Sequence, residues 1–241
     1  MKPPVLVIRT GSAPAPIRGR HGDFPQWFRV ATGLGRERVR EIDVVSGETL
    51  PAPDEVAGAF ITGSASMVTD RSAWSERTAG WIRSAMDRGL PLFGVCYGHQ
   101  LLAHALGGRV GYLPGGREIG TLPIERLAEA VDDPVAGALP GRFHAHTTHE
   151  QSVLELPAGA RVLARSARDP HHLLRYGPNA LSVQFHPEFN AEIMRAYIHR
   201  KRHDMRREGS DTRQVYAAVN PTPYARRLLR SFVQRRPPTF E

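Results

Sequence analysis

The chain has 241 residues, of which 41% are hydrophobic, and it carries 32 Lys and Arg against 24 Asp and Glu, a formal net charge of +8. This length and composition suffice for one full hydrophobic core. A single cysteine excludes an internal disulfide and is typical of a reducing compartment, so we expect a cytoplasmic protein. The N-terminal apolar run is too short for a signal peptide, and we expect no membrane-spanning segment.

Short apolar runs alternate with amphipathic stretches over the first hundred residues, which is typical of a doubly wound sheet of parallel strands. Asp23 suits the N-cap of a helix whose apolar face includes Trp27 and Phe28. Between Thr10 and Gly22 we expect a long loop, rich in Gly, Pro and Arg, that lines a site. The expected elements are strands at 5–8, 39–45 and 59–61, a helix at 74–86, and a strand from residue 92.

The second half favours strands with polar interruptions, followed by helices. Strands are expected at 118–126, 161–166, 171–176 and 181–185, the last two joined by a turn at Gly177–Asn179. Helical spacing begins at Asn190, and a last basic helix is expected at 224–233. We therefore divide the chain into a domain at 1–190 and a helical extension at 191–241 that packs on the same domain.

The only cysteine lies at an apparent strand-to-helix turn. Gly94 and Gly98 flank Cys96 in a G-x-C-x-G version of the nucleophile elbow, and a helical stretch that ends at Gly107–Gly108 follows. Small neighbours give strand and helix room to pass, and the positive end of the helix favours the reactive thiolate form. The alternative is a buried structural cysteine, which is the commoner fate of a lone Cys.

A histidine and a carboxylate follow another expected strand. His186, Pro187 and Glu188 come directly after the strand at 181–185, at the end where open α/β sheets carry their active sites. Glu188 is placed to orient the imidazole of His186 as the third member of a triad. The same three residues also suit a plain turn with a solvated carboxylate.

The stretches Gly94–Gln100 and Phe185–Phe189 together resemble the class I, or triad, glutamine amidotransferases, and within them the amidotransferase domain of GMP synthase and its stand-alone relatives. The resemblance covers most of residues 5–190. It implies a flavodoxin-like three-layer α/β/α fold with a mostly parallel central sheet. It also implies a catalytic triad of Cys96, His186 and Glu188 that hydrolyses a γ-glutamyl amide through a thioester.

The resemblance implies an oxyanion hole built from backbone N–H groups of Gly63, Ser64 and Tyr97. The family usually has two glycines after its third strand, so Ser64 is a departure from the pattern.

Substrate-binding residues carry over from the same resemblance. Gln100 matches a family glutamine that holds the amino-acid end of the substrate. Thr148 and His149 match a Ser-His segment that borders the glutamine pocket. The segment 116–120 resembles one that precedes a family strand, and no chemistry is assigned to it.

The expected reaction gives glutamate and ammonia from glutamine, with no metal and no cofactor. About fifty residues follow His186, too few for a synthase domain, which needs on the order of 100 or more. We therefore expect either a separate synthase subunit that receives the ammonia, or a stand-alone hydrolase of γ-glutamyl peptides or conjugates. The sequence does not decide between these substrates, and it does not indicate an oligomeric state.

Three other functions remain open from the residues. The histidines at 144, 146 and 149, joined by 171–172, are candidates for a zinc site, but no acidic or thiol partner has suitable spacing with them. Basic residues gather at 195–207 and 226–236 without the interleaved aromatic residues of a nucleic-acid platform, which favours a solvated or docking face. A non-catalytic module with a decayed triad is disfavoured because all three triad residue types are present.

Overall fold

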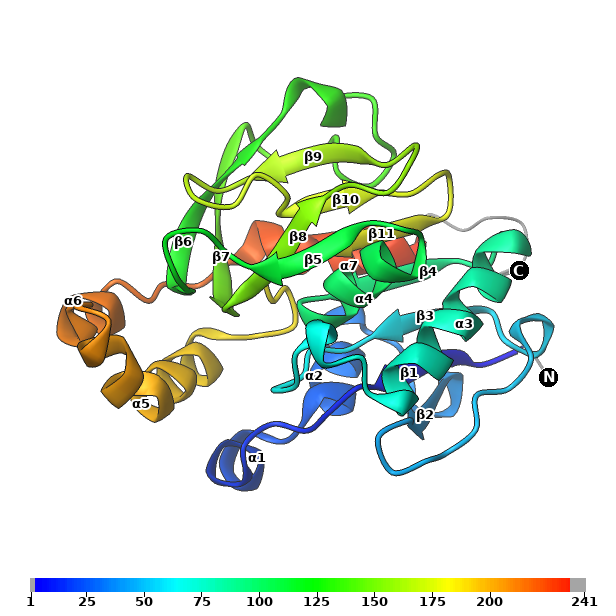
Figure 1. Ribbon diagram of the computed structural model, residues 1–241, viewed down its shortest axis with the longest axis horizontal. Helices are drawn as coiled ribbons and strands as arrows, with labels where there is room; N and C mark the ends of the chain where they lie inside the picture. Colours follow the sequence, from blue (N-terminus) through cyan, green and yellow to red (C-terminus); the bar gives the residue numbers. More distant parts are fainter. Residues whose placement is uncertain (1–2, 235–241) are drawn as a thin grey trace.

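A nine-stranded sheet forms the centre of the computed structural model, which describes residues 3–234 (Figure 1). Its strand order is β2-β1-β3-β4-β11-β10-β9-β6-β7, and β5 pairs with β8 in a separate two-stranded sheet. The strands are β1 (Val5–Arg9), β2 (Val39–Asp43), β3 (Gly58–Ile61), β4 (Leu92–Val95), β5 (Arg109–Tyr112), β6 (Glu118–Arg126), β7 (Arg142–His149), β8 (Gln151–Glu155), β9 (Arg161–Arg165), β10 (Leu173–Arg175) and β11 (Ala180–Val183). The helices are α1 (Ala15–His21), α2 (Phe24–Thr32), α3 (Ala73–Asp87), α4 (Tyr97–Ala105), α5 (Ala191–Arg207), α6 (Thr212–Ala217) and α7 (Pro223–Gln234).

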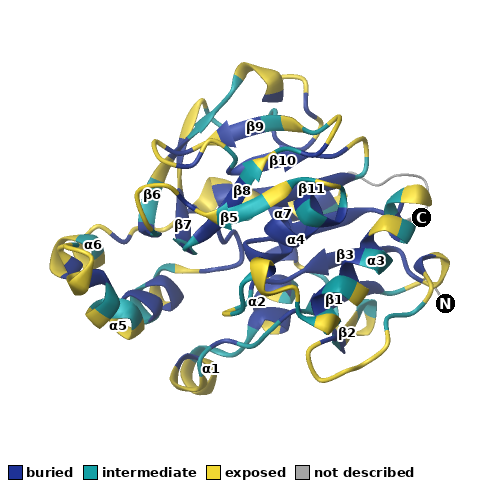
Figure 2. Ribbon diagram, in the orientation of Figure 1, coloured by how far each residue is buried: buried dark blue, intermediate teal, exposed yellow. Residues whose placement is uncertain are grey.

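Alternate residues of the parallel strands face two separate hydrophobic layers. On β1, Val5 and Val7 join the cluster that includes residues of α2, α5 and α7, while Leu6 and Ile8 join the cluster of α3 and α4. This alternation follows from the period of two along a strand, and burial on both faces explains why β1 is apolar throughout. Figure 2 shows the buried strands between partly exposed helices. The expected three-layer α/β/α fold is therefore confirmed.

The parallel strands place the candidate site residues at one edge of the sheet. Strands β3, β4 and β11 are neighbours and parallel, so their carboxyl ends lie side by side. Thr62–Ser64 follows β3, Cys96 follows β4, and His186 comes three residues after β11 ends. Residues far apart in sequence thus meet at this edge.

Four antiparallel strands, β10, β9, β6 and β7, continue the sheet beyond β11. The expected hairpin between β10 and β11 is confirmed, with the turn at Gly177–Asn179. Strand β7 was not expected, because its sequence contains three histidines and two threonines in place of a continuous apolar run. It pairs along its length with β6 and carries Thr148 and His149.

The expected loop between Thr10 and Gly22 is wrong in part, because residues Ala15–His21 form α1. Pro14 and Pro16 lie at its first positions, where a missing N–H group is harmless, and Gly22 adopts a positive φ of 81° at the C-terminal end. The preceding residues do line the cleft described below. Asp23 is confirmed as the cap of α2, since its carboxylate accepts a hydrogen bond from the Phe24 N–H at 2.9 Å.

Helices α5 and α7 follow the sheet as expected, and the short helix α6 between them was not expected. Asn190 caps α5 by accepting a hydrogen bond from the Ile193 N–H at 2.9 Å. The apolar face of α7 packs on the sheet, where the Phe232 ring lies 5.1 Å from that of Phe93. The division at residue 190 stays a prediction, and its last part, 235–241, lies outside the described residues. Within residues 3–234, no helix is long and apolar enough to cross a membrane.

Candidate active site

Cys96 lies on a strained turn between β4 and α4. Its φ of 52° and ψ of −103° are costly for a residue with a side chain, by about 1–3 kcal/mol. The Cys96 N–H donates to the Val183 carbonyl at 2.9 Å, which ties the turn to β11. A Cβ atom added at Gly94 would lie 2.4 Å from the Gly98 carbonyl oxygen, and one added at Gly98 would lie 2.3 Å from that of Ile61. The two glycines therefore permit the close passage of strand and helix that the sequence indicated.

We expect Gly98→Ala to lower the free energy of unfolding by about 3 kcal/mol, because its methyl group would overlap rigid backbone. Gly19→Ala is the matched control, since a Cβ atom there meets nothing within 4 Å. Urea denaturation of both variants measures the difference. Equal free energies of unfolding for the two variants would show that the turn accommodates a methyl group at position 98.

His186 and Glu188 form a buried pair beside this turn. The Nδ1 atom of His186 and Oε1 of Glu188 lie 2.7 Å apart, and both side chains are almost fully buried. The Phe189 ring stacks on the imidazole with centroids 4.1 Å apart. A Cβ atom at Gly63 would lie 3.1 Å from Cε1 of His186, so only glycine fits there without a small shift of a neighbour. Packing on both sides fixes the orientation of the ring.

The charges around His186 favour its protonated form. Burial by itself lowers the pKa of this imidazole, but the charges of Glu188 and Cys96 outweigh it and raise the pKa to about 10. Glu188 occupies Nδ1, so Nε2 is left as the ring nitrogen that has no hydrogen-bond partner within residues 3–234. An imidazole arranged in this way can exchange a proton with a neighbouring group through Nε2.

The loop after β3 is held by a buried threonine. Thr10 Oγ1 donates to the Thr62 carbonyl at 2.8 Å, and Thr62 Oγ1 in turn receives the Thr10 N–H at 3.1 Å. In the described part of the chain, the N–H groups of Gly63, Ser64 and Tyr97 donate to no protein acceptor. These three N–H groups are thus available to a ligand, as an oxyanion hole requires.

A cleft with two adjoining hollows surrounds the cysteine. Both hollows are lined by Ser64, Ala65, Cys96, Thr148 and Lys201. The wide hollow, about 210 Å³, is also lined by Ser12, Pro14, Phe24, His186, Tyr197, Arg200 and Asp204. The narrow hollow, about 100 Å³, is also lined by Ser66, Met67, Tyr97, Gln100, His149, Glu150 and Gln151.

Gln100 reaches the narrow hollow, but the protein already uses its amide N–H₂ group. Its Nε2 donates to the Gln151 carbonyl at 2.7 Å and to Gln184 Oε1 at 3.0 Å. The Thr148 carbonyl lies 4.0 Å from the sulfur of Cys96. His149 lies in the wall of the narrow hollow with both ring nitrogens engaged.

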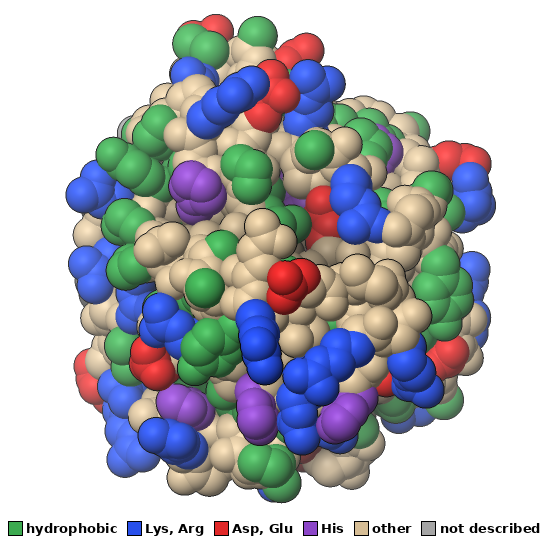
Figure 3. Space-filling view, turned by 90° about the vertical axis from the view of Figure 1, so that its left-hand side faces the viewer, with side chains coloured by type: hydrophobic (Ala, Val, Ile, Leu, Met, Phe, Trp, Pro, Cys, Tyr) green, Lys and Arg blue, Asp and Glu red, His purple; other side chains and the backbone are tan. Residues whose placement is uncertain are grey.

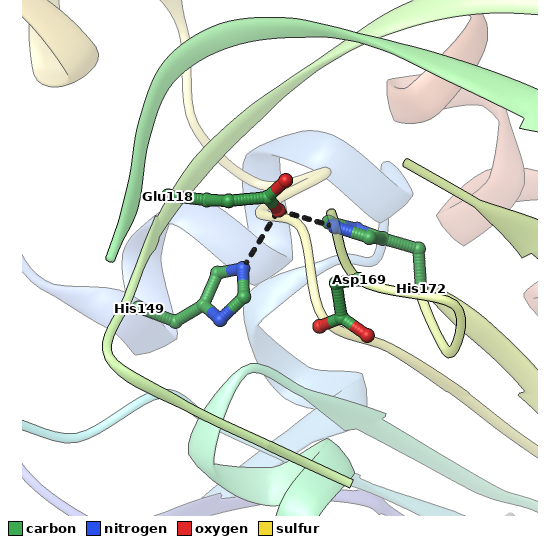
Figure 4. Close-up of side chains that lie close together, drawn as sticks. All are labelled: Glu118, His149, Asp169 and His172. Atoms are coloured by element: carbon green, nitrogen blue, oxygen red, sulfur yellow. Dashed lines mark hydrogen bonds and ion pairs between the residues drawn. The ribbon is translucent and has the colours of Figure 1, made fainter. Parts of the chain in front are cut away.

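A buried cluster that the sequence did not reveal holds His149 in place (Figure 4). Oε2 of Glu118 accepts from His149 Nε2 at 3.1 Å and from His172 Nε2 at 2.7 Å, and its Oε1 accepts from Ser166 at 2.6 Å. Nδ1 of His149 faces the Gln151 carbonyl at 2.9 Å, so both ring nitrogens have a hydrogen-bond partner. The cluster thereby anchors the end of β7 that carries Thr148. Glu118 belongs to the segment 116–120, to which the sequence assigned no chemistry.

This cluster also contains side chains that are chemically able to ligate a metal ion. Glu118, His149, Asp169 and His172 offer ligand atoms within 4.8 Å of one another. It differs from the zinc set weighed in the sequence, because His171 instead faces the Val153 carbonyl and His146 faces Thr121. Hydrogen bonds already engage Glu118 and both ring nitrogens of His149, and the absence of a metal remains a prediction.

We expect Glu118→Gln to lower the free energy of unfolding by about 3 kcal/mol at neutral pH, because buried His149 and His172 lose the carboxylate that accepts their hydrogen bonds. Burial opposes the charge, but hydrogen bonds from His149 and His172 hold the pKa of Glu118 well below its ordinary 4.5. This stabilisation is therefore present above pH 4.5 and is lost as the pH falls below that value. Urea titrations from pH 3 to 8 should show the two proteins converging in acid. A constant gap would contradict this origin.

A cysteine at a strand-to-helix elbow, with a histidine–glutamate pair after the neighbouring parallel strand, is the architecture of α/β enzymes that use a nucleophile elbow. The model of the family described as "Glutamine amidotransferase class-I" matches residues 36–204. The chain belongs to the class I glutamine amidotransferase family, as its two motifs indicated.

Individual relatives agree with this assignment. The chain is 38% identical over 131 residues to GMP synthase [glutamine-hydrolyzing] of Thermomicrobium roseum, a match that covers 54% of this chain and 23% of that protein. It is 30% identical to gamma-glutamyl peptidase 5 of Arabidopsis thaliana over 76% of this chain and 75% of the relative. The chain thus spans about a quarter of the length of the GMP synthases it matches.

The crystal structure of a glutamine amidotransferase from Thermotoga maritima superposes with a TM-score of 0.76, at 20% identity and with 98% of both chains covered. A glutamine amidotransferase from Methylobacillus flagellatus gives 0.75 at 19% identity, over 97% of this chain and 95% of the other. These likenesses confirm the fold over nearly the whole chain, helices α5 to α7 included.

Proposed function

We propose that this protein hydrolyses the γ-glutamyl amide bond of glutamine through a covalent thioester on Cys96. The observation that carries the proposal is the meeting of the strained Cys96 elbow and the buried His186–Glu188 pair in one cleft. Family membership supports it independently.

The proposed mechanism assigns one role to each group. The sulfur of Cys96 attacks the amide carbon, and the charge that develops on oxygen is met by the N–H groups of Gly63, Ser64 and Tyr97. His186 donates its Nε2 proton to the departing amine, then accepts one from the water that cleaves the thioester. Glu188 stabilises the imidazolium throughout, as its distance of 2.7 Å from Nδ1 allows.

We propose that a separate synthase subunit receives the ammonia. The matches to these GMP synthases cover 23% and 29% of their lengths, so most of each relative lies outside the part that this chain resembles. The nucleophile must stay reduced to react, so we place the reaction in a reducing compartment such as the cytoplasm.

Hydrolysis of γ-glutamyl peptides is the second candidate function. Gamma-glutamyl peptidase 5 and this chain match over three quarters of both lengths, so the likeness extends well beyond the two motifs. The same catalytic groups would release an amino acid or peptide in place of ammonia.

The decisive experiment measures glutamate released from glutamine and from γ-glutamyl dipeptides by the purified protein. We expect turnover of at least one of these compounds. No glutamate from any of them, with and without a GMP synthase subunit that lacks its own amidotransferase domain, would refute the proposed function.

A further inference from the structure

The two hollows that share Cys96 differ in the catalytic groups that line them. His186 lines the wide hollow only, and a general acid must reach the nitrogen that leaves. The acyl group stays on the sulfur after that nitrogen has left. The wide hollow therefore takes the leaving amine, and the glutamyl group occupies the narrow one.

The wide hollow is much larger than ammonia requires. Its volume is about 210 Å³, whereas a water molecule, which is similar in size to ammonia, occupies about 30 Å³ in the liquid. An amine of amino-acid size fills such a space far better, and filling it removes apolar surface of Phe24 and Tyr197 from water.

Two cations of α5 line the hollow that receives this amine. Arg200 forms no ion pair within residues 3–234, and Lys201 contacts Glu150 at 3.3 Å on the side of the narrow hollow. The one carboxylate in the wall of the wide hollow, among the described residues, is Asp204, which pairs with Arg207. Figure 3 views the side of the molecule where α1, α5 and α6 lie, and shows Lys, Arg and His side chains gathered over its lower half.

We infer that the leaving amine carries a carboxylate, which Arg200 and Lys201 bind. The substrate class is then a γ-glutamyl amino acid or short γ-glutamyl peptide with a free carboxyl end. This inference rests on the second candidate function, hydrolysis of γ-glutamyl peptides, and identifies α5 as the element that selects among γ-glutamyl compounds.

The test compares γ-glutamylglycine with γ-glutamylglycinamide, which has nearly the same shape and lacks the negative charge. We expect kcat/KM to be at least about tenfold higher for γ-glutamylglycine, the range of a charge-assisted hydrogen bond. We expect this ratio to fall toward one in Arg200→Ala and in the double variant R200A/K201A, and to reverse in Arg200→Glu. Arg206→Ala is the matched control, because Arg206 lies on the same helix outside the cleft, and it should keep the wild-type ratio.

The outcomes separate this inference from the proposed function. A wild-type ratio near one, or a ratio that the Arg200 variants leave unchanged, overturns the inference while hydrolysis itself stands. A wild-type protein that cleaves glutamine faster than γ-glutamylglycine also overturns it and favours delivery of ammonia. Absence of glutamate from every compound refutes the proposed function. Thermal unfolding of each variant confirms that a changed ratio arises in a folded protein.

Discussion

Replacing Cys96 with Ala should reduce glutamate release from γ-glutamyl substrates at least about 10⁴-fold. Without the sulfur no thioester forms, and only the N–H groups of the proposed oxyanion hole remain to assist attack by water. The measurement is the initial rate of glutamate formation on the best substrate. Mass spectrometry of the quenched reaction should show an acyl adduct on the wild-type chain and none on the variant.

Cys96→Gly provides the matched control for folding. Both variants lack the nucleophile, but glycine tolerates the backbone angles of this position, with φ at 52°. Relief of that strain exceeds the entropy lost by a glycine, so we expect the Gly variant to be more stable than the Ala variant by about 1 kcal/mol. Residual turnover in either variant above about one hundredth of the wild-type rate would contradict the assigned nucleophile.

Local residue chemistry predicts the elbow and the parallel strands well. The crossing of β4 and α4 leaves room only for glycine at positions 94 and 98. The spacing of Gly94 and Gly98 around Cys96 therefore predicts the turn. Strand β1 is apolar because both of its faces are covered by hydrophobic layers. The run of four consecutive apolar residues therefore predicts a central strand. The meeting of Cys96 and His186, ninety residues apart, follows from the adjacency of β4 and β11, which the two-motif resemblance implied.

Features that depend on tertiary pairing were not predictable in this way. Strand β7 has no apolar periodicity that identifies it, because it buries the polar residues His146, Thr147 and His149. Helix α1 was not predicted because prolines at its N-terminal end suit a first helical turn as well as a loop. Arg200 and Lys201 read as part of a solvated basic face, and only the fold of α5 over the cleft places them beside Cys96.

Replacing Glu188 with Gln should reduce kcat about 10²–10³-fold, because a neutral amide cannot stabilise the imidazolium that forms when the amide bond breaks. Burial lowers the pKa of His186, while Glu188 and Cys96 outweigh burial and raise it to about 10. Without the Glu188 charge, this pKa should move down toward its ordinary 6.5. Nuclear magnetic resonance of the imidazole over pH 5–11 measures the shift directly.

Glu188→Gln should also change how the free energy of unfolding depends on pH. A pKa raised in the folded state stabilises the fold fully below the ordinary value of 6.5 and loses that contribution as the pH rises to about 10. The wild type should therefore exceed Glu188→Gln in free energy of unfolding by about 3 kcal/mol at pH 6, the scale for breaking a buried ion pair, and the gap should narrow steadily toward pH 10. Glu192→Gln, an exposed carboxylate on α5, should show no such pH-dependent gap. A gap for Glu188→Gln that stays constant from pH 6 to 10 would mean that the Glu188 charge stabilises something other than the His186 imidazolium.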